Sequence, residues 1–259
     1  MAHSVYKYRK GEAYPHCYKY PQAAVTADWV LFSYDCKKLK VLLIKRGGEP
    51  FKGFWAFPGG FINPDETVEQ GAQRELMEET SLKADYMEQL KVFSTPDRDP
   101  RQRVITVPFL GLVRHSEAKS GDDAAEAAWF DIDQLPVLAF DHKQIFHEAM
   151  KALKISLEMN GAARFLMPDQ FTMPELYRLY SQILGVKLDR RNFARKMSSL
   201  GILDFRGTKD SYATERSKDL PSRTPSLFSF RNLIHSSEVQ ATQGTLKIAP
   251  VLFLMRFGL

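Results

Sequence analysis

The stretch from Gly59 to Leu82, GGFINPDETVEQGAQRELMEETSL, constrains this chain more than any other part of it. It runs from a tight Pro-Gly-Gly turn into a predicted helix that carries Glu75, Glu78 and Glu79. Helix positions three and four residues apart share one face, so these carboxylates crowd together and repel one another. Mg²⁺ relieves such repulsion, because carboxylate oxygens and substrate phosphates are its preferred ligands. For this helix on its own, a solvated acidic face remains the alternative.

The composition is that of an ordinary globular protein with one large domain or two modest ones. Hydrophobic residues make up 44% and charged residues 26% of the 259 residues, which allows an ample core. No apolar run approaches the roughly 18 residues that a membrane span requires. The N-terminal segment MAHSVYKYRKGEAYPHCYKY lacks the apolar stretch of a secretory signal. Cys17 and Cys36 form no framework spacing, so we expect free thiols in a cytoplasmic protein.

The net charge of +5 is unevenly distributed along the chain. Residues 171–231 hold twelve Lys and Arg against six Asp and Glu, whereas residues 1–170 hold twenty-two against twenty-four. The N-terminal part is slightly acidic and the C-terminal module is basic. This difference suggests two functions, one of which involves binding a polyanion.

The front of the chain alternates predicted strands and helices. Thr67 and Gln70 predict a capping box for the acidic helix. Asp141 can cap a second helix that runs to about Met159. Strands are expected at residues 23–34, 39–45, 86–94, 103–114 and 127–132. Asn160-Gly161 is the expected domain boundary, which gives an N-terminal extension at 1–22, a first domain at 23–160, a second domain at 161–231 and a tail of unknown role at 232–259.

The second domain has the element order of a winged helix-turn-helix. A capping box from Thr172 to Glu175 starts one helix, a short turn follows, and Asp189 starts another. Residues 202–205 and 226–230 are expected as the strands of a wing. The last helix carries a polar face that would enter the major groove of DNA, formed by Arg190, Arg191, Asn192, Arg195 and Lys196. A charged face that only meets water is the alternative.

The acidic stretch resembles the Nudix box, G-x5-E-x7-R-E-U-x-E-E-x-G-U with U apolar. The matching positions are Gly60, Glu66, Arg74, Glu75, Leu76, Glu78, Glu79 and Leu82. At about one chance in 15 per fixed residue, the six non-apolar matches coincide at ~10⁻⁷ per starting position. Ser81 departs from the pattern, since the family has glycine there. A non-glycine residue at that helix end costs about 1 kcal/mol if its φ is positive.

The resemblance extends over residues 20–231. Segments such as YPQAAVTADWVLF, FKGFWAFPGGF and LAFDHKQI resemble bacterial ADP-ribose pyrophosphatases. The segment FTMPELYRLYSQILGVKLDRRNFARKMSSLG is similar to the winged helix of the Nudix-related transcriptional regulators of NAD metabolism. The resemblance implies an α+β chain, in which a Nudix α/β/α sandwich with a mixed sheet precedes a winged helix-turn-helix domain.

The resemblance also implies roles for the box residues. Glu75 and Glu79 would bind Mg²⁺ or Mn²⁺ directly, Glu78 would be a further or water-mediated ligand, and the carbonyl of Gly59 would complete the shell. Arg74 and Glu66 would form an internal salt bridge. The metal would neutralise charge on the phosphates and activate a water for attack on phosphorus.

Roles outside the box are less closely defined. Arg98 and Arg101 are candidates for a phosphate or ribose clamp, with solvated turn charges as the alternative. Trp55 and Phe57 are candidates for flanking the base, with core packing as the alternative. Three acidic residues are candidates for the general base, although the last fits the following strand better: Asp122, Asp123 and Glu126.

Two functions follow from this resemblance, and they are compatible. The first is a homodimeric regulator that senses ADP-ribose or a related nucleotide diphosphate and binds double-stranded operator DNA. The second is a metal-dependent hydrolase of ADP-ribose. The alternative to regulation is a plain Nudix hydrolase whose C-terminal module serves dimerisation or protein docking.

Overall fold

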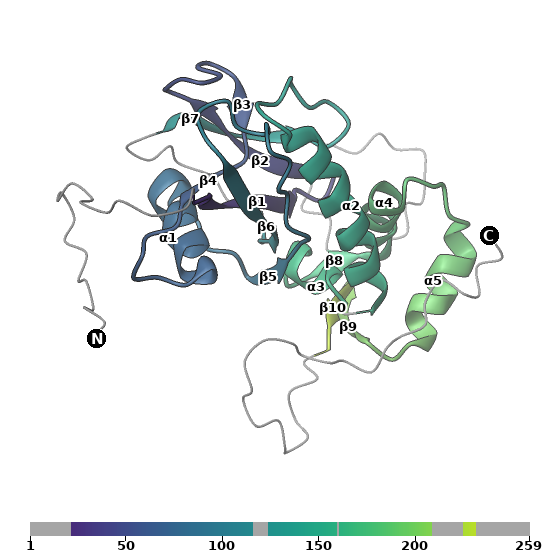
Figure 1. The fold of residues 1–259 in the computed structure, drawn as a ribbon. Coiled ribbons are helices and arrows are strands. Elements are labelled where there is room, and N and C mark those ends of the chain that lie inside the picture. The colour runs from purple at the N-terminus through teal and green to yellow at the C-terminus, as the bar shows by residue number, and fades with distance from the viewer. Residues whose placement is uncertain (1–21, 116–123, 160, 209–224, 232–259) are drawn as a thin grey trace.

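The computed structural model describes residues 22–115, 124–159, 161–208 and 225–231. Their elements form a sheet with helices on both faces, followed by a smaller helical part with its own sheet (Figure 1). The first part contains β1 (Ala24–Tyr34), β2 (Leu39–Arg46), β3 (Trp55–Ala56), β4 (Gly59–Phe61), α1 (Val68–Thr80), β5 (Tyr86–Gln89), β6 (Val104–Leu112), β7 (Ala124–Asp131) and α2 (His142–Met159).

The large sheet is mixed and has seven strands in the order β3-β2-β1-β6-β5, with β4 also paired to β1 and β7 to β2. Its centre is the parallel pair β1 and β6, in which Trp29 lies opposite Phe109. The remaining pairs are antiparallel. The short β4 brings Gly60 opposite Ala27, so the turn before the acidic helix lies against the central strand.

The side chains of β1 alternate between the two faces of the sheet and contribute to a separate hydrophobic core on each face. Trp29 and Leu31 pack in one cluster with Ala72 and Leu76 of α1. Val30 and Phe32 belong to the other cluster, which includes the buried face of α2. Successive side chains of a strand point to opposite faces, which is why adjacent residues join different cores. The predicted α/β/α sandwich is therefore confirmed.

The second part is a winged helix. It contains α3 (Ala163–Leu166), β8 (Phe171–Thr172), α4 (Met173–Leu184), α5 (Arg190–Ser199), β9 (Leu203–Thr208) and β10 (Ser226–Phe230). Both predicted caps are present, the capping box of Thr172 and Glu175 and the side-chain cap of Asp189. β8 joins the two wing strands in a three-stranded sheet of order β8-β10-β9, which the sequence did not suggest.

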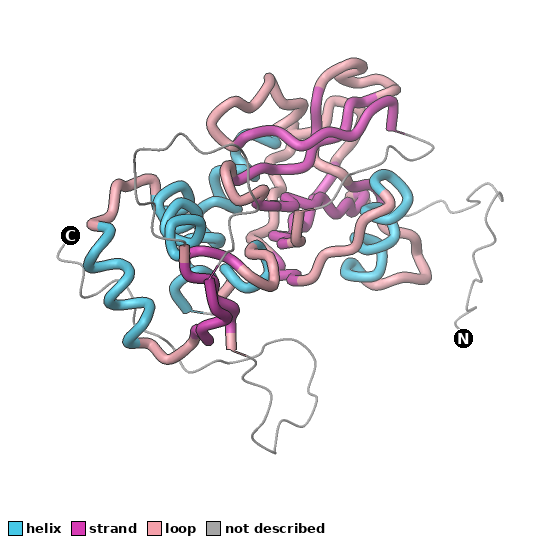
Figure 2. Tube along the Cα trace, turned by 180° about the vertical axis from the view of Figure 1, so that it is seen from behind, coloured by secondary structure: helices cyan, strands magenta, loops and turns pink. Residues whose placement is uncertain are grey.

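The two parts share one continuous core. Residues of β1, β2 and α2 belong to the same buried cluster as Leu179 of α4 and Phe193 of α5. The hairpin between β1 and β2 is bonded to α4, because the Gln182 side chain accepts from the Leu39 amide and donates to the Lys37 carbonyl, both at 2.7 Å. Helix α4 lies between the large sheet and α5, which stands away from that sheet (Figure 1), and Figure 2 shows the same arrangement from behind. The winged helix is thus packed onto the sandwich.

Some element limits differ from those expected. The strand predicted at residues 86–94 ends at Gln89, and only an isolated bridge between Phe93 and Thr106 continues it. Asp141, expected as the cap of α2, receives two hydrogen bonds from Arg98 on its carboxylate. No described helix is both long and apolar enough to cross a bilayer. Cys17 and the tail at 232–259 lie outside the described residues.

Candidate active site and nucleic-acid surface

Two glycines let the backbone approach the acidic helix α1. A Cβ at Gly59, whose φ is 153°, would lie 2.1 Å from the Ala27 carbonyl oxygen. A Cβ at Gly60 would lie 2.5 Å from the Glu75 carboxylate. The backbone of β1 leaves no room for a side chain at Gly59, whereas a side chain at Gly60 would require the Glu75 carboxylate to move. The turn thereby brings its backbone within reach of the helix carboxylates.

One guanidinium organises the acidic side chains. Arg74 donates to both carboxylate oxygens of Glu66 at 2.7 and 3.0 Å, which confirms the predicted salt bridge. It also donates to Glu75 at 2.7 Å and to Glu78 at 3.0 Å. The hydrogen bonds that Glu66 itself accepts from Arg74 hold the pKa of Glu66 at about 2. Arg74 therefore offsets the repulsion among the carboxylates and fixes the loop against the helix.

Two of the three crowded glutamates face a cleft. Glu75 and Glu79 line it, whereas Glu78 is 55% exposed and pairs with Arg74. Burial raises the pKa of Glu75, although Arg74 opposes the shift. In the part of the chain that the structure describes, no three His, Cys, Asp or Glu side chains form a ready-made metal cluster. Two carboxylates still suit Mg²⁺, which completes its shell with phosphate and water oxygens.

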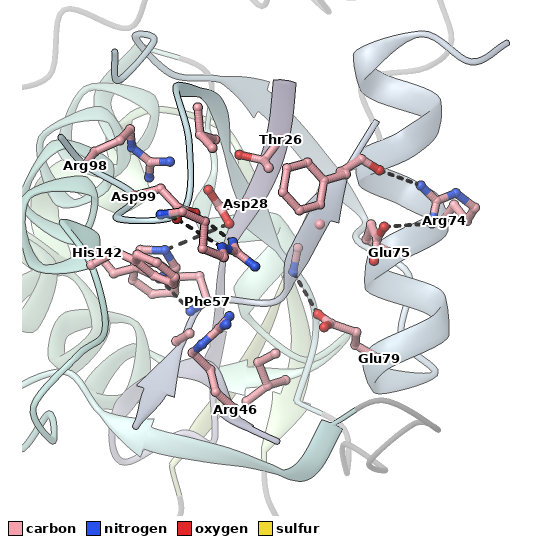
Figure 3. A pocket seen from close by; sticks show the side chains of 18 of the residues that line it. Thr26, Asp28, Arg46, Phe57, Arg74, Glu75, Glu79, Arg98, Asp99 and His142 are labelled. Carbon is pink, nitrogen blue, oxygen red and sulfur yellow. Dashed lines mark hydrogen bonds and ion pairs between the residues drawn. The ribbon is translucent and has the colours of Figure 1, made fainter. Parts of the chain in front are cut away.

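The cleft has a volume of about 400 Å³ and is lined by both carboxylates and guanidinium groups. In Figure 3, Glu75 and Glu79 project from α1 on one side, while Arg98 lies across the cleft and Arg46 below. Arg101 also lines it. Carboxylates that can hold a cation and arginines that bind phosphate therefore face one space, which suits a diphosphate.

The arginines of the cleft are themselves held in place. Arg98 is almost fully buried and makes a two-bond pair with Asp141 at 2.7 and 3.0 Å. Arg101 makes the same kind of pair with Asp99. Both predicted clamp residues thus line the cleft, but each already has a carboxylate partner. Arg46, at the end of β2, was not predicted, because a single cation at a strand end gives no distinctive pattern.

A buried histidine forms the floor of the cleft. His142 accepts a hydrogen bond on Nδ1 from the Phe57 amide at 2.9 Å, and its Nε2 lies 4.0 Å from the Asp28 carboxylate. Burial lowers the pKa of His142, and the hydrogen bond that Nδ1 accepts from the Phe57 amide is that of an imidazole with its proton on Nε2. Asp28 also accepts a hydrogen bond from the Thr106 hydroxyl. Residues so far apart in the chain give no sequence signal.

The aromatic candidates require a correction. Trp55 does not line the cleft, because its ring packs edge-on against Phe130 at 4.7 Å. Phe57 does line the cleft, but it is 1% exposed and stacks on His142 at 5.3 Å. The more accessible aromatic ring of the cleft is Phe61, which is 41% exposed and lies 5.6 Å from the Arg101 guanidinium.

The structure places one of the three candidate bases. Glu126 lies on β7 opposite Lys45, with an ion pair of 3.7 Å, and does not line the cleft. Its assignment to the strand is confirmed, and its role as general base is not supported. Asp122 and Asp123 lie outside the described residues.

Helix α5 presents a polar surface over an apolar base. Phe193 and Met197 are buried, whereas the predicted DNA-facing residues are exposed or, for Lys196, partly exposed: Arg190, Arg191, Asn192, Arg195 and Lys196. Asn192 accepts a hydrogen bond from Arg195 at 2.6 Å, and Arg190 lies 5.4 Å from the Tyr177 ring. The surface is thus available for DNA and partly preorganised.

The sandwich contains a glutamate-bearing helix that Arg74 holds in place, and a winged helix is attached to it. These features identify the class: a protein with a Nudix fold and a second domain of a DNA-binding type. Residues 24–151 match the model of the NUDIX domain, and residues 163–220 match that of the NrtR DNA-binding winged helix domain.

Several known proteins resemble this chain, among them the following three. The ADPR responsive transcriptional repressor NtrR of Acinetobacter baylyi is 32% identical over 82% of this chain and 83% of its own length. The ADP-ribose pyrophosphatase of Methanocaldococcus jannaschii is 47% identical over 51% of this chain and 76% of its own length. Shewanella oneidensis NrtR, in a crystal structure with a 27mer DNA, has a TM-score of 0.64 at 31% identity, covering 80% of this chain and 93% of that one. This chain belongs to the NrtR family of Nudix-related transcriptional regulators.

Proposed function

We infer that this protein regulates transcription, binding ADP-ribose in its Nudix cleft and operator DNA through its winged helix. The observation that carries the inference is the shared core, because the same buried cluster includes residues of the sandwich that forms the diphosphate-type cleft and residues of the winged helix. The A. baylyi relative, described as ADPR responsive, supports the choice of effector. The S. oneidensis NrtR structure with a 27mer DNA supports the choice of partner.

The same cleft is proposed to hydrolyse its ligand. Glu75 and Glu79 would hold Mg²⁺ or Mn²⁺, which supplies charge neutralisation and a more acidic bound water. Arg46, Arg98 and Arg101 would orient the diphosphate. Water would add its oxygen to one phosphorus as the bond from that phosphorus to the bridging oxygen breaks, and the bridging oxygen would take up a proton. The products from ADP-ribose are AMP and ribose 5-phosphate.

On DNA, the exposed face of α5 is proposed to supply base contacts. Arg and Asn form two-bond contacts with guanine and adenine in the major groove, whereas Lys serves phosphates. Proteins of this kind read two half-sites through two-fold symmetry, so we propose a cytoplasmic homodimer.

A mobility shift tests the regulatory role. The full chain would be titrated against DNA from its own upstream region, with and without ADP-ribose and Mg²⁺. We expect specific binding whose affinity changes about fivefold or more on addition of ADP-ribose. No binding to this DNA, together with monomeric behaviour at micromolar protein, would contradict the proposal and favour a docking role for the C-terminal module.

Turnover is tested separately with a matched pair of variants. Glu79→Gln should abolish AMP formation from ADP-ribose, whereas Glu69→Gln, on the exposed first turn of α1, should leave it unchanged. Equal AMP formation by the wild-type protein and by Glu79→Gln would show that the hydrolytic half of the proposal is wrong. DNA binding would then still be decided by the mobility shift.

A further inference from the structure

A second cavity lies where the winged helix meets the sandwich. Its volume is about 360 Å³, and none of its lining residues lines the first cleft. Arg114 follows β6 of the sandwich and Arg164 lies on α3, whereas Arg206 on β9 and Arg231 after β10 belong to the wing. Asp169 is the single carboxylate of the lining. Four guanidinium groups against one carboxylate make this cavity a place for an anion.

Arg164 is the residue that most requires a ligand. Its Nε is buried and has no hydrogen-bond partner among the described residues. Its guanidinium lies 6.0 Å from the Phe230 ring, which offers only a weak interaction with the cation. A buried charged donor without an acceptor is costly, and an oxyanion in the cavity that Arg164 lines would offset that cost by pairing with its positive charge.

Two of the other arginines, Arg114 and Arg231, can turn to a ligand at little cost, whereas Arg206 also donates a hydrogen bond to the Ser229 hydroxyl at 2.7 Å. Arg114 pairs with Asp169 at 2.6 Å, and these side chains are 52% and 82% exposed. Arg231 pairs with Asp204 at 2.9 Å, and Arg206 lies 3.6 Å from the same carboxylate. Exposed ion pairs are weak because water and salt screen them, so a dianion in the cavity would compete effectively for these guanidiniums.

We propose that this inter-domain cavity is a second ligand site, which binds a small phosphate monoester through Arg114 and Arg164. The chemistry follows from the guanidinium fork, which matches two oxygens of one phosphate. The volume accommodates the phosphate with a small organic group attached. The site does not depend on turnover in the first cleft.

Occupancy of this site would link the sandwich to the wing. Arg114 follows β6 in the first part of the chain, whereas Arg206 lies on β9 and Arg231 directly follows β10 of the wing. A phosphate held by both sides would stabilise one position of the wing. DNA affinity would therefore respond to the ligand.

The test measures binding of inorganic phosphate, and then of AMP and ribose 5-phosphate, to the full chain by calorimetry. Ionic strength is kept constant with chloride. Arg164→Gln and Arg114→Gln should each weaken phosphate binding about tenfold or more, since each removes a charged donor. One variant that also removes one positive charge should leave it within twofold: Lys151→Gln on α2, outside both cavities.

Each outcome decides the proposal. Arg114 is half-exposed, so Arg114→Gln gives the result even if Arg164→Gln does not fold. The site is supported if Arg164→Gln and Arg114→Gln lose phosphate binding and the control does not. No binding by the wild-type protein up to about 10 mM phosphate, or equal binding by all variants, overturns it. Loss of DNA affinity without loss of phosphate affinity also overturns it, because the arginines would then contact the DNA backbone.

Discussion

The amide of Gly59 donates a 2.7 Å hydrogen bond to the carboxylate of Glu79, twenty residues further along the chain. This bond ties the turn before the Nudix helix to the last turn of that helix. We assign the Glu79 carboxylate to the metal, and its position therefore depends on the backbone geometry at the start of the Nudix box. Substitutions in the turn should separate effects on stability from effects on turnover.

Gly59→Ala should mainly destabilise the protein. The new Cβ would lie 2.1 Å from a backbone oxygen of β1, which cannot move without distorting the sheet. We expect the free energy of unfolding to fall by about 2–3 kcal/mol, measured by urea denaturation. Gly48→Ala is the control, because a Cβ there meets nothing within 4 Å. Equal stability of the two variants would contradict the close approach at Gly59.

Gly60→Ala should mainly impair hydrolysis. Its Cβ would lie 2.5 Å from the Glu75 carboxylate, which is the end of a flexible side chain and can move away. Displacing this proposed metal ligand should lower kcat at least about tenfold while the free energy of unfolding changes by less than about 1 kcal/mol. Steady-state AMP formation and denaturation on the same sample would measure both. Unchanged kcat would argue against Glu75 as a metal ligand.

Glu66 should make stability depend on acid pH. The Arg74 guanidinium holds the pKa of Glu66 at about 2, below its ordinary value of 4.5. A lowered pKa gives stability that is present above pH 4.5 and lost as the pH falls from there towards 2. Partial exposure of the pair limits the contribution to about 1–2 kcal/mol. Glu66→Gln should flatten the denaturation profile in that window, and a profile equal to wild type would refute the assignment.

Ser81→Gly should stabilise the protein. Ser81 ends α1 in the left-handed region with a φ of 56°, where a side chain is strained. Glycine removes that strain, and we expect a gain of about 0.5–1 kcal/mol in the free energy of unfolding. Ser198→Gly on the exposed face of α5 is the control with the opposite sign, because glycine inside a helix costs stability. A loss of stability in Ser81→Gly would show that other contacts of Ser81 outweigh the strain.

Gln182→Ala should weaken communication between the two parts. Its amide bonds the β1–β2 hairpin to α4 through Leu39 and Lys37. Removing both bonds should cost about 1–2 kcal/mol of stability and reduce the effect of ADP-ribose on DNA affinity in the mobility shift. Gln144→Ala, on the exposed face of α2, should change neither. If the effect of ADP-ribose persists in full, the signal passes by another route.

Arg191→Gln should weaken DNA binding without affecting hydrolysis. Arg191 is exposed on α5, far in the fold from the Nudix helix (Figure 1). The affinity should fall by about 1–3 kcal/mol if the residue contacts a base, and the salt dependence should change by about one counterion if it contacts a phosphate. Measuring affinity at several salt concentrations distinguishes the two contacts. Wild-type affinity at every salt concentration would show that Arg191 contacts neither a base nor a phosphate.

The local features were predictable because they depend on neighbours in the chain. The capping boxes at Thr67 and Thr172 each need only a partner three residues away. The salt bridge of Arg74 to Glu66 spans one loop and two helix turns. The left-handed end at Ser81 follows from the helix pattern itself.

The sequence alone determined the box, the longer helices and strands and the two-part organisation, since each is written in spacing and periodicity, whereas the short β3, β4, α3 and β8 were not predicted. Only the tertiary structure decided the remainder of both sites. Asp28 and His142 meet at the cleft because β1 and α2 pack together, and Arg114 and Arg231 meet because the wing docks on the sandwich. Such contacts join residues that are distant in the chain, and their positions depend on how whole layers pack rather than on any local pattern.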